Sequence, residues 1–487
     1  MAERPNLLVF MSDQHSGGVM GGAGDPFART PNLDALARRG VSFRRAYCGN
    51  PLCVPSRMTF LTGRPSSDIR VWSNHCELRS LIPTFAHSLA GAGYETVLCG
   101  RMHFHGADHR HGFEKHLVGD VTGQWPGARG PDLGCIPLST TGQSRPAVEV
   151  AGAGRSAYQA FDQAVVKGAR EYLRAYAASR RERPFAMVAG GVLPHCPFIC
   201  PRSLFEEFYA KVDVPRLSEA ERAGMHPALK RWREVRGVDG LSDDQVRTAR
   251  AAYYGLVTLL DGLLGELFAE LEEAGLAGDT AVVYVSDHGD MAGKHEMWWK
   301  SCFYEDSVTV PMIASWPGRW AQGVMVETPV SLLDLAPTLT ELGGGEALPF
   351  VAGRSLSRFL AGQGEPEGWR EEVFSECCGC PGGEGPSRMI VRWPWKLVHH
   401  HGYAEPQLFD LENDPGETRD LRGEAAFSCV REELHTRAKA GWDGEEMERL
   451  LARVRGEYRA ISNWAKAARP PDPDHWIEPP GCNVFPE

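Results

Sequence analysis

The 487-residue sequence lacks the marks of membrane, secreted and nucleic-acid-binding proteins. No apolar run approaches the roughly 18 residues that a membrane-spanning helix needs, so we expect no such helix. The apolar segment Leu7–Met11 is shorter than the h-region of a signal peptide, and no small-residue cleavage site follows it. The sequence therefore predicts a cytoplasmic protein with no membrane partner.

Basic residues are too few and too scattered for a nucleic-acid partner. The chain has 52 Lys and Arg against 63 Asp and Glu, a formal net charge of −11, and it contains no basic tract. A nucleic-acid-binding surface needs clustered Lys and Arg. The apolar share of 43% is ordinary for a globular protein and allows a substantial core.

Cysteine is too sparse for a disulfide-stabilised scaffold. The 13 cysteines are odd in number and irregularly spaced, so we expect reduced thiols. Cys377, Cys378 and Cys380 lie close together, but no second Cys/His pair follows at the spacing of a structural zinc site. Their role is left open.

Short apolar segments alternate with helical ones, which predicts an α/β fold with a large, mostly parallel central sheet flanked by helices. The expected strands are Leu7–Met11, Thr96–Cys99, Phe185–Ala189 and Ala281–Val285. Helices are expected from Pro31 to Gly40, from Pro83 to Gly91 and, after a capping-box pattern at Ser242, to Ala274. Asp261, inside the last of these helices, is expected to be buried, hydrogen-bonded and without a catalytic part.

We assign residues 1–345 to this α/β domain and residues 346–487 to a smaller C-terminal α+β subdomain. A Gly/Pro/Glu-rich segment at 343–367 marks the boundary. The subdomain is expected to hold strands at Met389–Val398 and Gln407–Leu411, an exposed loop at His399–His401, and a helix at Glu445–Ala468. The Pro-rich tail from Pro470 indicates contact with a neighbouring subunit, which predicts a homo-oligomer.

Polar, reactive residues follow four of the predicted strands. These segments are Ser12–His15, Gly100–His103, Leu193–His195 and Ser286–Asp290. In open α/β sheets, ligands bind outside the carboxyl ends of the strands. Residues that are far apart in the sequence are therefore expected to meet in one crevice.

Several of these residues have side chains of the types that bind metal ions. Asp13 and Asp287 offer carboxylate oxygens, His288 an imidazole and Gln14 an amide oxygen. Ca²⁺ and Mg²⁺ prefer oxygen throughout, whereas the imidazole keeps Mn²⁺, Fe²⁺ and Zn²⁺ open.

The most specific motif is Cys-x-Pro-Ser-Arg at Cys53–Arg57, followed by Leu-Thr-Gly-Arg at 61–64. Further motifs stand in order along the chain: Thr-Pro-Asn-Leu-Asp at 30–34, Pro-His-x-Pro-Phe at 194–198, Ser-Asp-His-Gly-Asp at 286–290 and Trp-Lys at 299–300. On these residues the chain resembles the type I, formylglycine-dependent sulfatases of the alkaline phosphatase superfamily. The resemblance covers most of the chain.

Within that superfamily, the pairs Asp13–Gln14 and Asp287–His288 and the segment Met102–Phe104 are similar to the choline-sulfatase and phosphonate monoester hydrolase branch. Arg101 departs from the pattern, because most sulfatases have Lys there. Arg keeps the positive charge and offers a planar fork to an oxyanion.

The resemblance implies that a formylglycine-generating enzyme converts Cys53 to formylglycine (3-oxoalanine), whose hydrate attacks the sulfur of a small sulfate ester. It implies one divalent metal, with calcium expected from the family and Mn, Zn or Mg left open. The implied metal ligands are Asp13, Gln14, Cys53, Asp287 and His288. The implied catalytic residues are Cys53, Arg57, Arg101, His103, His195 and Lys300, with His103 as the base that helps to expel sulfate. Asn74 and His105 are expected to bind the rest of the substrate.

Two other functions fit the same residues. A phosphonate monoester or phosphodiester hydrolase would use the same nucleophile and metal, and its substrate carries the same single negative charge. A non-catalytic pseudoenzyme would keep the metal site without maturing Cys53, although it would have no chemical need for the intact motif.

Overall fold

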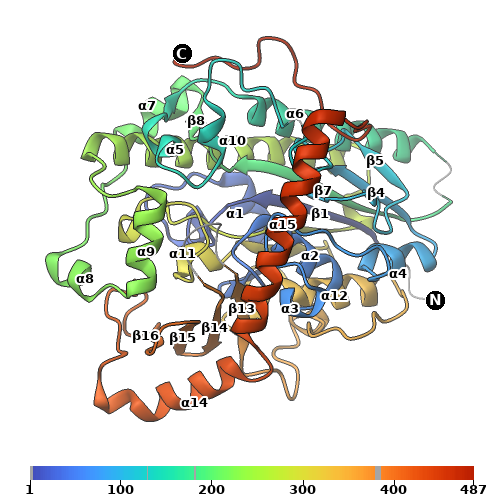
Figure 1. The fold of residues 1–487 in the computed structure, drawn as a ribbon. Helices are drawn as coiled ribbons and strands as arrows, with labels where there is room; N and C mark the ends of the chain where they lie inside the picture. Colours follow the sequence, from blue (N-terminus) through green and yellow to red (C-terminus); the bar gives the residue numbers. More distant parts are fainter. Residues whose placement is uncertain (1–3, 129, 180–181, 379–384) are drawn as a thin grey trace.

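An eight-stranded sheet forms the centre of the molecule (Figure 1). The computed structural model describes residues 4–128, 130–179, 182–378 and 385–487. Only β10 in this sheet runs antiparallel to its neighbours. In spatial order the strands are β11 (Val324–Val326), β2 (Val41–Phe43), β10 (Met312–Ser315), β9 (Thr280–Ser286), β1 (Asn6–Asp13), β7 (Phe185–Pro194), β4 (Glu95–Gly100) and β5 (Lys115–Leu117). The prediction of a large, mostly parallel sheet is confirmed.

Helices cover both faces of this sheet. α6 (Ala157–Ala178) and α10 (Asp243–Glu273) pack on one face, over β7. α2 (Cys53–Thr62), α4 (Phe85–Gly91) and α12 (Leu335–Leu342) pack together on the other (Figure 1). A strand covered on both sides is apolar throughout instead of alternating. This explains why β1, buried along its whole length, contains the continuous apolar segment Leu7–Met11.

The predicted helices form where the end signals place them. α10 begins with the capping box at Ser242, whose hydroxyl accepts from the Gln245 N–H. The start of α1 (Pro31–Arg38) is capped from α10, because Asp261 accepts from the N–H groups of Asn32 and Leu33 at 3.1 and 2.8 Å. The buried, structural role expected for Asp261 is confirmed.

One described helix, α10, is long and apolar enough to cross a membrane by length and composition. Of the apolar window in this helix, 72% is buried inside the protein. Burial of this extent is what a core helix shows.

The smaller sheet, in the C-terminal part of the chain, is antiparallel. Its strands are β13 (Val373–Cys377), β14 (Ser387–Arg392), β15 (Trp395–His400) and β16 (Gln407–Asp410). The single strand expected at Met389–Val398 is wrong, because Trp393 and Pro394 form a hairpin turn between β14 and β15. Proline has no N–H to give to a strand ladder, so it favours a turn at that point.

The exposed loop predicted at His399–His401 is also wrong, since His399 and His400 complete β15 and are buried. The ring of His400 hydrogen-bonds Ser387 and Gln407 at 3.0 Å each. It also stacks on the His226 ring, with centroids 4.7 Å apart. Pairing with both neighbouring strands extends β15 beyond the point where its apolar pattern stops.

A buried ion cluster joins the smaller sheet to the main domain. Lys396 of β15 is fully buried, and its Nζ lies 2.9 Å from Glu305 Oε1 and 2.7 Å from Glu417 Oε1. Glu305 begins α11 (Glu305–Val308) of the main domain. Because an unpaired buried charge is strongly destabilising, these contacts tie the two sheets together.

The C-terminal part returns to the main domain. After α14 (Ser428–Lys439), α15 (Gly444–Ala468), red in Figure 1, runs back across it. The tail then pairs with its own chain: Asp120 exchanges backbone hydrogen bonds with Asp474 and Trp476, and Val484 bonds Arg155. The tail therefore no longer argues for a neighbouring subunit, and the homo-oligomer stays a prediction.

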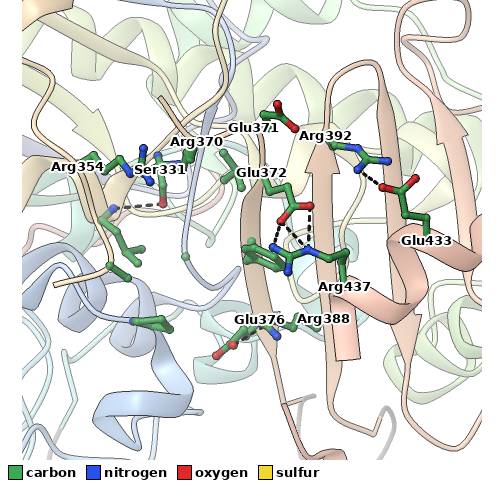
Figure 2. A pocket seen from close by; sticks show the side chains of 16 residues that line it. Ser331, Arg354, Arg370, Glu371, Glu372, Glu376, Arg388, Arg392, Glu433 and Arg437 are labelled. Atoms are coloured by element: carbon green, nitrogen blue, oxygen red, sulfur yellow. Dashed lines mark hydrogen bonds and ion pairs between the residues drawn. The ribbon is translucent and has the colours of Figure 1, made fainter. Parts of the chain in front are cut away.

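A cavity of about 620 Å³ lies between the smaller sheet and the main domain (Figure 2). Its charged lining is largely paired: Arg392 with Glu433 and Arg437 with Glu372 inside the lining, and Arg370 with Asp334 outside it. None of its lining residues belongs to the polar group around Cys53 described next.

Candidate active site

The ends of four neighbouring strands form the base of the site. β9, β1, β7 and β4 are adjacent and parallel. Asp13 ends β1, Asp287 follows β9, His195 follows β7 and Arg101 follows β4. The carboxyl ends of parallel strands meet at one edge of a sheet. The structure thus brings together the four polar segments that the sequence analysis expected to meet.

Cys53 is the first residue of α2. Its Sγ lies 2.9 Å from Lys300 Nζ, 3.3 Å from His288 Nε2 and 3.6 Å from Asp13 Oδ1. The next N–H, of Val54, is capped by Asn74 Oδ1 at 3.0 Å. Free N–H groups at a helix start favour negative charge, so the fold places residue 53 where an anion is stabilised.

Four of the predicted metal ligands lie close enough to hold one ion. Ligand atoms of Asp13, Cys53, Asp287 and His288, all buried, lie within 4.8 Å of one another. Two carboxylates and an imidazole are suitable donors for a divalent cation. These four are the only such group of His, Cys, Asp and Glu within the described ranges.

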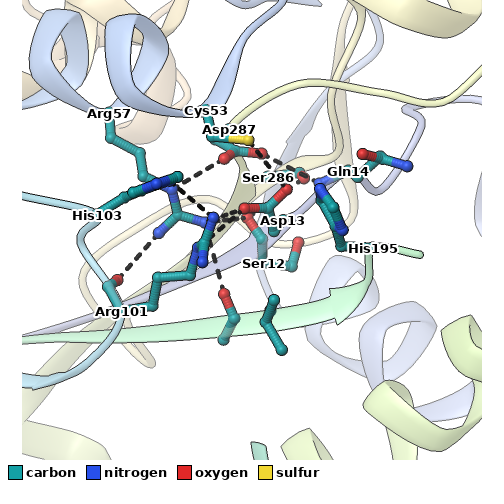
Figure 3. A network of polar contacts seen from close by, with 12 residues as sticks. Ser12, Asp13, Gln14, Cys53, Arg57, Arg101, His103, His195, Ser286 and Asp287 are labelled. Atoms are coloured by element: carbon teal, nitrogen blue, oxygen red, sulfur yellow. Dashed lines mark hydrogen bonds and ion pairs between the residues drawn. The ribbon is translucent and has the colours of Figure 1, made fainter. Parts of the chain in front are cut away.

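Gln14 is placed to complete this group. Its Nε2 donates to Asp290 Oδ2 at 2.6 Å, while its buried Oε1 meets no hydrogen-bond partner among the described residues. Figure 3 shows the amide oxygen on the side of Asp287 and the amide nitrogen on the far side. A buried acceptor without a donor is costly unless something binds it. The residues therefore fit a divalent metal, with the Gln14 oxygen as a further donor.

Arg57 holds the two carboxylates in place. It is fully buried, and its Nε lies 2.9 Å from Asp287 Oδ2 while its Nη2 lies 3.2 Å from Asp13 Oδ2 (Figure 3). Its Nη1 donates to the Arg101 carbonyl at 3.0 Å. Arg57 therefore bonds the carboxylates of Asp13 and Asp287, two of the predicted metal ligands.

Burial and the concentrated charge shift the pKa values of the site. Although burial favours the neutral acid, the cations Lys300 and Arg101 hold the pKa of Asp13 below its ordinary value. Burial and the nearby Asp13 charge raise the pKa of Asp287. Burial also favours the neutral Cys53 thiol, but the Lys300 ammonium lowers its pKa well below the ordinary value. The site thus stabilises negative charge at residue 53.

Arg101 bridges Asp13 and His103. Its Nε lies 3.1 Å from Asp13 Oδ2, and its Nη2 donates to His103 Nδ1 at 2.7 Å. A guanidinium only donates, so Nδ1 accepts this bond and the neutral imidazole carries its proton on Nε2. The same ring hydrogen-bonds Cys53. Burial and the Arg101 charge lower the pKa of His103, which keeps this imidazole neutral.

Lys300 and His195 face Cys53 from other directions. Lys300 is buried, and its ammonium group also lies 3.7 Å from Asp13 Oδ1. His195 donates from Nδ1 to the Cys196 carbonyl at 2.7 Å and also hydrogen-bonds Cys53. Two groups that can carry positive charge therefore flank the position where an anionic ester would react.

Asp120 and Asp290 support the site, although neither is among the predicted site residues. Asp120 accepts from the N–H groups of Met102 and His103 at 3.1 and 2.7 Å, which holds His103 at a φ of 61°. Such a φ is uncommon outside glycine and has to be imposed by the surroundings. Asp290, which orients Gln14, stands inside the Ser-Asp-His-Gly-Asp motif, whereas no local pattern marks Asp120.

The two residues expected to bind the rest of the substrate lie beside the site. Asn74 is engaged by Val54, as described above, and the His105 ring lies 5.2 Å from that of His103. Cys377 and Cys378 are buried and form no disulfide, while Cys380 lies outside the described residues. None of the twelve cysteines in the described ranges forms a disulfide.

Comparison with known families decides the class. A family model described as Sulfatase matches residues 5–345. The chain belongs to the sulfatase family. A second model, N-sulphoglucosamine sulphohydrolase, C-terminal, matches residues 293–441 of this sulfatase. The protein is accordingly a sulfuric ester hydrolase with the fold of the alkaline phosphatase superfamily, as predicted.

Individual relatives cover nearly the whole sulfatase chain. The choline-sulfatase of Rhizobium meliloti (strain 1021) is 32% identical over 95% of this chain and 92% of its own. Arylsulfatase K of Danio rerio is 28% identical over 88% of this chain and 82% of its own. The crystal structure of the phosphonate monoester hydrolase of Agrobacterium radiobacter superposes with a TM-score of 0.74 at 26% identity, covering 93% of this chain and 96% of its own. These similarities support the predicted position near the choline-sulfatase and phosphonate monoester hydrolase branch.

Proposed function

We propose that this sulfatase hydrolyses a small sulfate ester to an alcohol and inorganic sulfate, with Cys53 converted to formylglycine by a formylglycine-generating enzyme. The position of Cys53 carries the proposal. Its side chain lies at a buried helix start, 2.9 Å from the Lys300 ammonium and 3.3 Å from the His288 imidazole. An ordinary structural thiol has no need of such surroundings.

In this proposal one divalent metal is held by Asp13, Gln14, Asp287, His288 and residue 53. Three of the four unmodified ligands offer oxygen, which favours calcium and keeps Mg open, while the imidazole leaves Mn or Zn open. When bound, the metal makes a hydroxyl of the hydrated aldehyde more acidic and so a better nucleophile toward sulfur. Arg57 keeps the Asp13 and Asp287 carboxylates in position for it.

Cations of the chain stabilise the charge that develops on the sulfate. Lys300 and His195 face the ester oxygens and the departing alkoxide, and Arg101 adds positive charge from the side of Asp13. Preorganised positive groups of this kind usually supply the largest part of the rate enhancement.

His103 is the proposed base that takes a proton from residue 53 so that sulfate can leave. Because its Nδ1 accepts from Arg101, the ring carries its proton on Nε2 in this arrangement. Nδ1 is then the unprotonated nitrogen, and the Arg101 hydrogen bond holds the ring beside residue 53 until Nδ1 takes the proton.

Residues 1–345 are proposed as the catalytic domain and residues 346–487 as a C-terminal subdomain that contains α15. Cytoplasmic location and homo-oligomerisation stay predictions.

Mass spectrometry and a sulfate assay test the proposal together. In protein from a host with the maturing enzyme, the peptide that contains residue 53 should be about 18 Da lighter, since a CH₂SH group becomes CHO. The same preparation should release sulfate from an ester. Finding only the thiol, with no sulfate release, would favour the non-catalytic pseudoenzyme.

The alternative of a phosphonate monoester or phosphodiester hydrolase is kept because of the similarity to the Agrobacterium radiobacter structure. Turnover of matched sulfate and phosphonate esters with the same alcohol separates the two. A phosphonate advantage of orders of magnitude in kcat/KM would replace the sulfate ester as the substrate.

A further inference from the structure

The end of β7 departs from the regular strand ladder. Gly190 still pairs with Met11 of β1, and the pairing with β4 also ends at Gly190. The next pair with β1 joins Pro194 to Asp13, so β7 advances by four residues while β1 advances by two. β7 therefore contains a bulge at residues 191–193. Bulges beside active sites re-aim the side chains that follow them.

A buried carboxylate from α6 holds this bulge. Asp162 is fully buried, and its two oxygens accept from the N–H groups of Val192 and Leu193 at 2.7 and 3.0 Å. The carboxylate thus replaces the partners that a regular strand would offer to these two N–H groups. Gly191 permits the close approach, because a Cβ at this position would lie 2.8 Å from Asp162 Oδ2.

The bulge is connected directly to His195, which lies among the polar residues around Cys53 (Figure 3). The His195 N–H donates to the carbonyl of Val192 at 3.0 Å, and the N–H of Val192 is one of the two that Asp162 binds. Tyr158 stands one turn before Asp162 on the same face of α6, and its ring lies 6.1 Å from the His195 ring. α6 therefore supports His195 through the bulge and through an aromatic contact.

Asp261 on α10 is the structural counterpart of Asp162. It too is a buried helix aspartate that accepts from two consecutive N–H groups, those of Asn32 and Leu33. Neither of these residues is among the predicted site residues. The two aspartates thus make the same kind of contact, but one holds a helix start and the other holds the segment that leads into His195.

We propose that Asp162 is a positioning residue, which holds the β7 bulge so that His195 faces the ester oxygens and the departing alkoxide. The proposal rests on the proposed sulfatase function and extends it to a residue of α6. Because Asp162 acts through His195, its effect on turnover should depend on His195. That dependence distinguishes it from a residue that only stabilises the fold.

Two aryl sulfates that differ in the acidity of the leaving group test the proposal. In Asp162→Asn the amide nitrogen faces one of the two N–H groups, donor against donor, so the bulge loses a hydrogen bond. For phenyl sulfate kcat/KM should fall by about 10- to 100-fold, because His195 is misplaced. For 4-nitrophenyl sulfate, whose leaving group needs less stabilisation, the loss should be about threefold or less. Asp261→Asn is the matched control and should leave both values within about twofold while it lowers thermal stability.

The loss should disappear when His195 is removed. In a His195→Gln background, Asp162→Asn should change kcat/KM for phenyl sulfate by less than about twofold, since residues that act through one contact are not additive. Asp162→Ser removes the buried charge and keeps one acceptor. It is the second variant if Asp162→Asn folds poorly, and it should show the same selective loss.

A measurement without turnover follows His195 itself. In protein labelled with ¹³C at histidine, the His195 signal in the NMR spectrum is identified by its absence from His195→Gln. This signal should shift in Asp162→Asn and keep its position in Asp261→Asn, because only the first substitution alters the bulge.

The outcomes separate this proposal from the proposed function. If no ester releases sulfate, the proposed function is overturned, and the His195 signal still decides whether Asp162 positions this ring. An unmoved signal, or equal losses with both substrates, would overturn the positioning role. Additive losses in the His195→Gln background would also overturn it and would point to another group, such as Arg57, whose Nη2 donates to the Gly191 carbonyl at 3.5 Å.

Discussion

Replacing Arg101 by lysine tests whether the enzyme uses the bridge that this side chain makes. The guanidinium, 3% exposed, reaches Asp13 Oδ2 at 3.1 Å with one nitrogen and His103 Nδ1 at 2.7 Å with another. A lysine keeps the positive charge, but its single ammonium cannot reproduce the planar fork that spans the two groups. The substitution therefore removes one charge-assisted hydrogen bond without changing the formal charge.

The size of the expected effect follows from that bond. Hydrogen bonds to charged groups contribute about 1.5–3 kcal/mol, and each 1.36 kcal/mol corresponds to a factor of ten. Since Asp13 keeps Arg57 as a partner in Arg101→Lys, the loss should fall on the positioning of His103. We expect kcat/KM for a sulfate ester to fall between about 10- and 150-fold.

The assay is sulfate release by matured enzyme, with formylglycine content measured in each preparation and thermal unfolding recorded to confirm the fold. Arg101→Met, which also removes the charge, should lose more activity than Arg101→Lys. Activity of Arg101→Lys within about twofold of the unsubstituted enzyme would show that the bridge to His103 has no part in turnover.

Four further predictions follow from other parts of the structure. Cys53→Ala should abolish sulfate release and leave thermal unfolding nearly unchanged, and turnover near the original level would contradict the assigned nucleophile. Chelation should inactivate the enzyme and added divalent metal should restore it, as measured by sulfate release before and after metal is returned. Burial lowers the pKa of His400 to about 3 from an ordinary 6.5, so below pH 6.5 the unfolded chain binds a proton that the folded protein excludes. The free energy of unfolding should therefore decrease as the pH is lowered, by about 2 kcal/mol at pH 5 from this group. On acidification, the urea midpoint of His400→Gln should decline less than that of the unsubstituted protein. Parallel declines would refute the assignment. Lys396→Met should destabilise the protein by about 3–5 kcal/mol, because Glu305 and Glu417 lose their buried partner. A urea midpoint that does not fall would show that this ion cluster does not stabilise the fold.

Much of the fold could be predicted because local patterns carry it. The apolar segment Leu7–Met11 predicts a strand covered on both faces, and the capping box at Ser242 predicts the start of α10. Local sequence patterns fail where pairing with a neighbouring strand decides whether a segment is a strand or a loop. His399 and His400 look like an exposed polar stretch, yet pairing with both neighbours makes them part of β15.

Some residues of the candidate site could likewise be predicted from the sequence, and others could not. Residues that directly follow predicted strands, such as Asp13 and Asp287, could be expected to meet, because the carboxyl ends of parallel strands share one edge. Asp120, which holds His103, could not be found in this way, since its contact depends on how a loop folds back over β4.

By itself the amino-acid sequence determined the four central strands of the main sheet and several helices, because these depend on residue type and short-range spacing. The motif around Cys53 carries the resemblance that implies the reaction class. Only the tertiary structure decided which cation contacts which carboxylate, that Gln14 is oriented by Asp290, and that Asp162 holds the bulge before His195. Such contacts join residues up to several hundred positions apart, and packing across the sheet sets their geometry. Local sequence patterns carry no information about that packing.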